Sequence, residues 1–142
     1  MKITDMTVTI IGDAGDINPD KGGVEPLALV RIYTDEGLMG TSESFRVPPG
    51  VARAVMHGPD SFFGAHLIGE ELSHPERIWQ LLYDSMMHYN RKGWSLMCLG
   101  AVDIAIWDLY GKMLNEPVYK LLGGVQRNYY QTPESNSEVV VT

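Results

Sequence analysis

The sequence has little cysteine, little positive charge and no long apolar run. It contains one cysteine, Cys98, so no disulfide can form within the chain, which is typical of a reducing compartment. Its 11 basic and 18 acidic residues give a formal net charge of −7, which argues against nucleic acid as a partner, since phosphate binding needs a basic surface. The uncharged runs are too short for a membrane span, and the N-terminus lacks the apolar block of a signal peptide. We therefore expect a cytoplasmic protein that binds neither nucleic acid nor membrane.

The part of the chain up to Phe45 carries the pattern of a small antiparallel sheet. Met6, Val8 and Ile10 alternate with polar residues, which predicts a half-buried strand. Residues 11–26 are rich in Gly, Asp and Pro and are predicted to form a long loop. Two further runs, PLALVRIYT and LMGTSESF, flank the turn sequence DEG and indicate a hairpin. The sequence therefore predicts three antiparallel strands.

Helical patterns follow these strands. Short helical pieces are predicted after residue 50, interrupted at Gly58-Pro59 and at Gly64. Ser73 and Glu76 have the spacing of a capping box, which predicts a helix start. The residues expected to share one face of that helix are Ile78, Leu81, Leu82, Ser85, Met86 and Tyr89. Strands followed by helices indicate an α+β fold.

A second long helix is predicted from about Ser95 to Leu114, because Pro117 prevents it from continuing far. One of its faces is apolar and consists of Leu99, Val102, Ile106, Leu109 and Met113. A second side is uncharged and consists of Gly100, Ile104, Trp107 and Gly111. Because apolar residues occur on both sides, we expect this helix to be sandwiched between two layers.

Three charged residues interrupt this apolar helix. Asp108 and Lys112 are four residues apart and can form a pair worth roughly 0.2–0.5 kcal/mol. Asp103 lies on a different side, near Tyr110, where it could accept hydrogen bonds. No second carboxylate, histidine or glycine-rich phosphate loop stands nearby in a suitable order. We therefore interpret the three charges as structural and not catalytic.

Two segments carry a family resemblance. Residues 100–124, GAVDIAIWDLYGKMLNEPVYKLLGG, resemble the last helices of the N-terminal capping domain in the mandelate racemase and muconate lactonizing enzyme group of the enolase superfamily. The predicted hairpin resembles that family's motif V-x-I-x-T-D-x-G-x-x-G-x-G-E, and the matching residues are Val30, Ile32, Thr34, Asp35, Gly37, Gly40 and Glu43. Ser42 stands where the family usually has glycine.

The resemblance implies an enolase N-terminal-like α+β domain, in which a three-stranded antiparallel sheet is followed by a helical bundle. It covers residues 1–125, which we expect to form the capping domain. Residues 126–142 would be the start of a truncated barrel or an irregular tail, because Pro133 and the polar residues after it interrupt the expected barrel strand. The catalytic (β/α) barrel of the family is absent from this sequence.

The resemblance also implies a chemistry. Members of the family remove a proton α to a carboxylate and stabilise the resulting enediolate with Mg²⁺. In these enzymes the barrel supplies the metal ligands and the acid and base groups, so no catalytic or metal-binding residue is assigned to this chain. The expected parent enzyme is an acid-sugar dehydratase, with a racemase or epimerase as the close alternative. Its expected partners are the C-terminal barrel, a small carboxylate substrate and further copies of itself in a homo-oligomer.

By position, two loops of this chain match those that close over the barrel mouth in the family. The first, residues 12–23, offers Asp13, Asp16, Asp20 and Lys21 for substrate hydroxyl or carboxylate groups. The second, residues 45–50, offers Arg46, whose planar guanidinium can hold a carboxylate with two hydrogen bonds. The alternative is an ordinary solvated loop with a surface arginine.

Two further readings of the sequence stay open. Arg91 and Lys92 precede a predicted helix and form either an anion site or, more simply, a solvated connector. The whole chain could also act as a non-catalytic, stand-alone binding or assembly module. The four histidines lack the paired spacing of metal ligands, and Cys98 is expected in the core.

Overall fold

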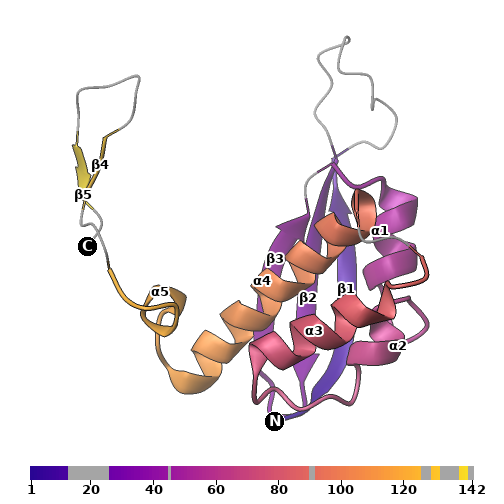
Figure 1. The fold of residues 1–142 in the computed structure, drawn as a ribbon, viewed down its shortest axis with the longest axis horizontal. Coiled ribbons are helices and arrows are strands. Elements are labelled where there is room, and N and C mark those ends of the chain that lie inside the picture. Colours follow the sequence, from indigo (N-terminus) through magenta and orange to yellow (C-terminus); the bar gives the residue numbers. More distant parts are fainter. Residues whose placement is uncertain (13–25, 45, 90–91, 126–128, 132–137, 141–142) are drawn as a thin grey trace.

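The fold begins with a three-stranded antiparallel sheet (Figure 1). The computed structural model describes residues 1–12, 26–44, 46–89, 92–125, 129–131 and 138–140. Within it the strands are β1 (Ile3–Ile11), β2 (Leu27–Thr34) and β3 (Met39–Ser44), in the order β1-β2-β3. Tyr33 pairs with Met39 across the turn that joins β2 to β3, and Gly37 in this turn has a φ of 82°. The predicted sheet and hairpin are confirmed.

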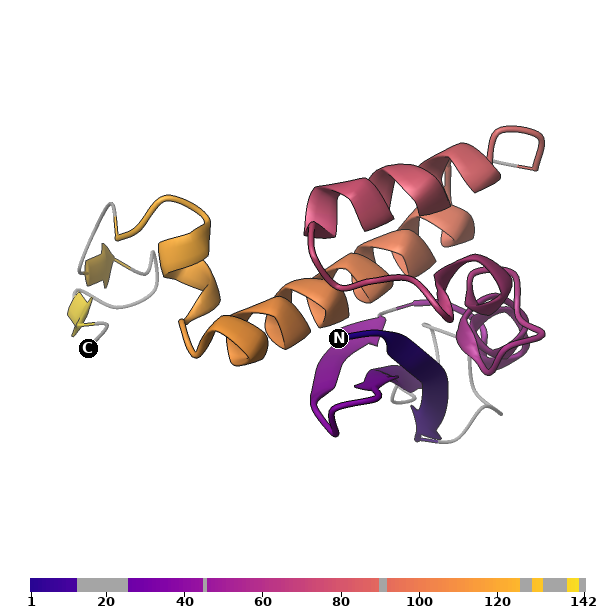
Figure 2. The ribbon, with the colours of Figure 1, turned by 90° about the horizontal axis from the view of Figure 1, so that it is seen from below.

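Five helices follow in the described part of the chain: α1 (Pro49–Met56), α2 (Gly64–Leu67), α3 (Pro75–Ser85), α4 (Trp94–Leu114) and α5 (Val118–Leu121). Helices α1 to α4 lie on one face of the sheet, with α1 and α2 over β1 and α4 over β2 and β3 (Figures 1 and 2). Helix α5 lies beyond the end of α4 (Figure 1). Two short strands, β4 (Tyr129–Gln131) and β5 (Glu138–Val140), form a separate antiparallel pair. The predicted α+β class is confirmed.

Three details of the helix prediction are wrong. Helix α3 is not capped by Ser73, because it begins at Pro75, and its N-cap residue His74 makes no side-chain capping hydrogen bond. Proline suits the first helical position, since its φ is already fixed near the helical value. Gly64 begins α2 and does not interrupt a helix. Tyr89 lies beyond the end of α3 and is 76% exposed.

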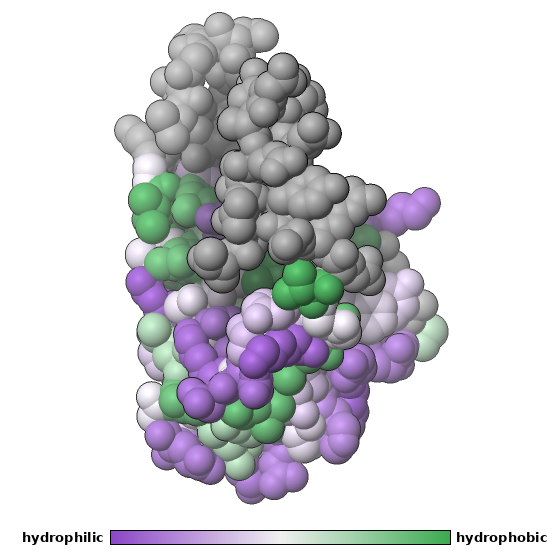
Figure 3. Space-filling model, turned by 90° about the vertical axis from the view of Figure 1, so that its left-hand side faces the viewer, coloured by the Kyte–Doolittle hydropathy of each residue, from purple (hydrophilic) through white to green (hydrophobic). Residues whose placement is uncertain are grey.

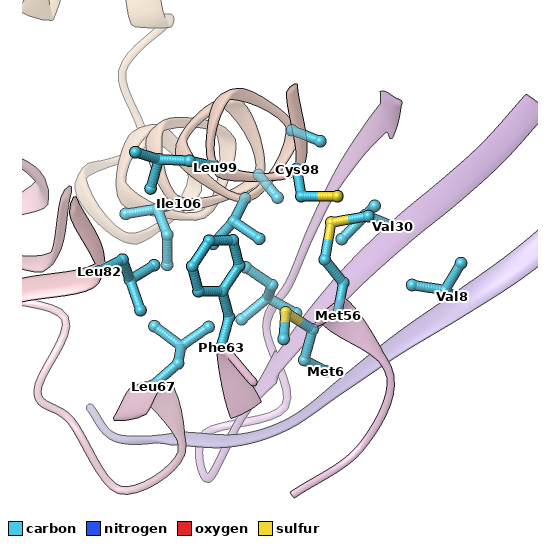
Figure 4. Packing of buried hydrophobic residues seen from close by; sticks show 14 of the residues in the cluster. Met6, Val8, Val30, Met56, Phe63, Leu67, Leu82, Cys98, Leu99 and Ile106 are labelled. Atoms are coloured by element: carbon cyan, nitrogen blue, oxygen red, sulfur yellow. The ribbon is translucent and has the colours of Figure 1, made fainter. Parts of the chain in front are cut away.

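The core lies between the sheet and the helices. Alternate residues of the strands, including Met6, Val8 and Val30, turn toward the helices and are buried, with α1 and α2 over β1 and α4 over β2. The ring of Phe63 is fully buried and lies between the side chains of α4 and those of the sheet and α2 (Figure 4). Burying an apolar side chain of this size contributes roughly 1.5–3 kcal/mol, so this interface supplies much of the fold's stability.

Both edges of the sheet are hydrogen-bonded to other parts of the chain. On the β1 edge, the backbone N–H of Val8 donates to Nδ1 of His57 at 2.9 Å, and the N–H of Gly58 donates to the Met6 carbonyl at 2.7 Å. On the β3 edge, the N–H of Thr41 donates to Oδ2 of Asp108 at 2.8 Å. These bonds satisfy groups that an open sheet edge would otherwise offer to another strand.

Strand β3 approaches α4 unusually closely. A Cβ atom added at Gly40 would lie 2.1 Å from the Ala105 carbonyl oxygen and 2.8 Å from the Leu109 Cβ. Two residues on, the Ser42 hydroxyl donates a 2.5 Å hydrogen bond to the Ala101 carbonyl. Serine fits at position 42 because its small side chain is hydrogen-bonded to the helix that it meets.

We predict that Gly40→Ala lowers the free energy of unfolding by about 3 kcal/mol, because overpacking against backbone atoms forces the strand and helix apart. Urea denaturation followed by circular dichroism measures the change. Gly50→Ala on α1 is the matched control, because a Cβ at Gly50 meets no atom within 4 Å. If the two variants unfold at the same urea concentration, the close approach does not constrain the fold.

Candidate functional site

The two predicted substrate loops leave the same end of the sheet. In the strand register Ile11, which ends β1, pairs with Leu27, which begins β2. Ser44, which ends β3, pairs with the neighbouring Ala28. The segment between β1 and β2 and the segment after β3 therefore start from adjacent positions (Figure 1). Of the predicted contact residues, Asp13, Asp16, Asp20 and Lys21 lie outside the described residues.

Arg46 lies at this end of the sheet and is exposed. Its φ of 58° is in the left-handed region, which is uncommon for a residue other than glycine. Two residues earlier, the Ser44 hydroxyl is buried, and in the described part of the chain it has no hydrogen-bond partner. Unusual backbone and unsatisfied polar groups each cost roughly 1–3 kcal/mol and collect at functional regions. No sequence signal distinguished Ser44.

Asp108 and Lys112 connect α4 to the edge of the sheet. The predicted pair is confirmed, with 2.6 Å between Lys112 Nζ and Asp108 Oδ2. The pair also extends to β3, since Lys112 donates to the Met39 carbonyl and Asp108 accepts from Thr41. Burial alone would raise the pKa of Asp108, but hydrogen bonds from Lys112 and Thr41 outweigh it and lower the pKa. These contacts make Asp108 a structural residue.

Asp103 has a different environment from the one predicted. It lines a small cleft between α3 and α4, together with Glu76, Trp79 and Trp107. Burial, and secondarily the charge of Glu76, raise the pKa of Asp103. The expectation that no second carboxylate stands nearby is therefore wrong. Glu76 lies 27 positions earlier, and only the packing of α3 against α4 brings it close.

The prediction that α4 is sandwiched between two layers is confirmed in part, because α4 lies between the sheet and α3 but one side of it is uncovered in the described structure (Figure 2). The face that includes Leu99 and Ile106 is buried against the sheet and α3. On the opposite side Ile104 is 58% exposed, and no described element covers it. Further exposed apolar residues continue along the end of α4 and the segment after it: Leu114, Tyr119, Leu122 and Val125. Figure 3 views the molecule from the left-hand side of Figure 1, where green apolar residues lie among purple polar ones.

The metal, thiol and anion sites considered from the sequence are not supported by the described residues. Among the described residues, no three His, Cys, Asp or Glu side chains come together to hold a metal ion. The thiol of Cys98 is buried, as predicted, and burial raises its pKa to about 12, so it is not a reactive thiolate. Arg91 lies outside the described residues, and Lys92 is exposed. None of the described helices combines the length and apolar character that crossing a bilayer requires.

Comparison with known proteins identifies the family. Residues 18–123 match the family described as mandelate racemase / muconate lactonizing enzyme, N-terminal domain. The chain belongs to this family. The fold is similar to that of a solved structure, the 3,6-anhydro-D-galactonate cycloisomerase from Zobellia galactanivorans. The match covers 91% of this chain and 34% of that one, with a TM-score of 0.76 and 30% identity.

Curated relatives of this N-terminal domain include acid-sugar dehydratases. A D-galactonate dehydratase from Verminephrobacter eiseniae is 38% identical over 73% of this chain and 26% of its own length. An arabinonate dehydratase from Saccharolobus solfataricus is 32% identical over 82% of this chain and 32% of its own length. An L-rhamnonate dehydratase from Saccharopolyspora erythraea is 32% identical over 72% of this chain and 25% of its own length. The chain thus spans about a quarter to a third of these relatives.

We predict that the same substitution at the two aspartates of α4 has opposite effects. The pKa of Asp108 is lowered on folding, so its ionised form stabilises the fold above the unfolded pKa of about 3.9, and this contribution disappears as pH falls. The pKa of Asp103 is raised, so its ionised form destabilises the fold at neutral pH, and this cost disappears in acid. Asp108→Asn should therefore lower the free energy of unfolding by about 1 kcal/mol at pH 7. Asp103→Asn should raise it by less than about 1 kcal/mol, because solvent screens the charge of this half-exposed group.

Urea unfolding at pH 7 and at about pH 3 measures both effects, since that interval spans the ordinary carboxyl pKa. At the lower pH, the free energy of unfolding of each aspartate variant should lie closer to that of the wild type. Glu116→Gln is the control, because Glu116 belongs to an exposed pair with Lys120 at the far end of α4. If both aspartate variants changed the free energy of unfolding in the same direction at pH 7, the two carboxylates would not have opposite electrostatic environments.

Proposed function

We propose that this chain is the capping domain of an acid-sugar dehydratase of the enolase superfamily. The observation that carries the proposal is the agreement of three dehydratase relatives at 32% to 38% identity. In this proposal the reaction is the loss of water that follows removal of a proton α to the substrate carboxylate. A racemase or epimerase of the same superfamily begins with the same proton abstraction and is the alternative reaction.

Arg46 is the residue of the described structure that we propose contacts the substrate carboxylate. Its guanidinium has paired N–H donors that match the two oxygens of a carboxylate. Its position supports this role, because the segment after β3 and the segment between β1 and β2 leave the same end of the sheet. The left-handed backbone at Arg46 adds support, and so does the Ser44 hydroxyl, which no described residue pairs with, since both lower the stability of the fold and such features collect at functional regions. Asp16, Asp20 and Lys21 are proposed as further contacts from the first loop.

A C-terminal barrel would complete this enzyme. The exposed apolar residues of α4 and of the segment after it, Ile104, Leu114, Leu122 and Val125 among them, support such a docking surface. Family membership implies Mg²⁺ in the parent enzyme. The described residues of this chain do not fit that ion, because they offer no group of three suitable side chains. We therefore assign the metal, and the acid and base groups, to the barrel.

The first test is the intact mass of the protein purified from its native source. A mass well above 15.8 kDa, with a barrel following this domain, is expected. That protein should then dehydrate acid sugars in the presence of Mg²⁺, which product analysis by mass spectrometry measures. A mass of 15.8 kDa would overturn the proposal and support a non-catalytic binding or assembly module.

In the full-length protein, we predict that Arg46→Gln raises KM for the acid sugar about 30-fold, because a charge-assisted pair worth about 2 kcal/mol is lost. Steady-state kinetics measure the change. Arg46→Lys keeps the charge but not the paired donors, so it should recover only part of the affinity. Arg53→Gln on α1 is the control for loss of an exposed positive charge. An unchanged KM in Arg46→Gln would exclude this contact.

A further inference from the structure

The cleft between α3 and α4 has the composition of a cation-binding site. Each helix contributes one carboxylate and one indole, Glu76 with Trp79 from α3 and Asp103 with Trp107 from α4. These pairs are three and four residues apart, so each pair lies on one helical face. The two helices run side by side (Figure 2), and the cleft between them has a volume of about 230 Å³. Aromatic rings and carboxylates thus meet in one small open space.

Neighbouring aromatic rings hold the two indoles in place. Trp79 stacks on Tyr83, with 4.8 Å between ring centroids and 11° between ring planes. Trp107 meets Tyr110 edge to face at 6.0 Å. Each indole is in contact with an aromatic ring of its own helix, so its orientation is restricted before any ligand binds. Side chains that are already restricted lose little conformational entropy when a ligand binds.

The negative charge of the cleft is not neutralised by the described residues. In that part of the chain, neither Glu76 nor Asp103 has a hydrogen-bond or ion-pair partner. Two carboxylates side by side repel each other, and burial of one of them adds a desolvation cost. A cation supplied from outside would remove both costs. The charge of the cleft therefore selects a positive ligand.

The shape and chemistry of the cleft favour an organic cation over a metal ion. Ca²⁺ takes six to eight oxygen ligands, and Mg²⁺ takes six, whereas two side-chain carboxylates are present. Indole faces attract ammonium and guanidinium groups, and arginine is the more frequent of the two in such contacts. A planar guanidinium can lie along an indole while its N–H groups donate to both carboxylates.

We propose that this cleft binds the guanidinium of an arginine side chain on the surface of a partner protein. The cleft is smaller than the roughly 300–1,000 Å³ of typical small-molecule pockets, which suits one side-chain head group. The two indoles, Trp79 and Trp107, supply the apolar walls of the cleft. Arginine and apolar residues together are typical of the centre of a protein interface. This inference does not depend on the proposed reaction.

The test is an NMR titration of the chain with N-acetyl-arginine amide, observed at the indole N–H signals. The sequence has three tryptophans, and Trp94 is an internal reference because it does not line the cleft. We expect saturable shifts at Trp79 and Trp107, with a dissociation constant in the millimolar range, and little change at Trp94. N-acetyl-citrulline amide has the same shape without the charge and should bind at least about tenfold more weakly.

Matched variants locate the binding. Asp103→Asn combined with Glu76→Gln should weaken arginine binding at least about tenfold, a loss of 1.4 kcal/mol or more. Glu116→Gln combined with Asp84→Asn removes the same net charge outside the cleft and should leave binding unchanged. Equal responses to the arginine and citrulline compounds would overturn the proposal. So would the absence of any saturable shift, or an equal response of Trp94.

Discussion

The close contact between β3 and α4 is the constraint on which the other features depend. Gly40 lets the strand reach the Ala105 carbonyl, and the hydroxyl of Ser42 then bonds to the helix backbone. The N–H of Thr41 bonds to Asp108 on the same helix. Because β3 is an edge strand, these bonds replace a strand partner and fix both the height and the rotation of α4 over the sheet.

The fixed rotation of α4 gives its two aspartates opposite electrostatic environments. Asp103 and Asp108 are five residues apart, which places them about 140° apart around the helix axis. Asp108 therefore turns toward the sheet edge and is hydrogen-bonded, so its pKa is lowered. Asp103 turns toward α3, where burial and Glu76 raise its pKa. One helix thus carries a stabilising carboxylate and a second one that no described residue pairs with, which we propose suits an external cation.

The antiparallel topology separates the stable part of the domain from the part that we propose contacts substrate. Core residues such as Met6 and Val30 lie along the middle of the strands, where α1 and α2 cover β1 and α4 covers β2. The loops emerge at one end, where Arg46 has a left-handed backbone and the Ser44 hydroxyl has no partner among the described residues. A rigid scaffold can support such unfavourable groups at its rim, which is where binding residues commonly occur.

The sequence alone determined the features that depend on local spacing. The alternation of Met6, Val8 and Ile10 predicted β1, and apolar periodicity with Pro117 beyond its end predicted α4 within a residue of its bounds. The capping-box spacing misplaced the start of α3 at Ser73, because the helix begins at Pro75 and no side-chain cap forms. Contacts between distant residues were decided only by tertiary packing. The Ser42 hydroxyl bonds to a carbonyl 59 residues away, and Glu76 meets Asp103 across two helices, because the close approach at Gly40 sets where α4 lies.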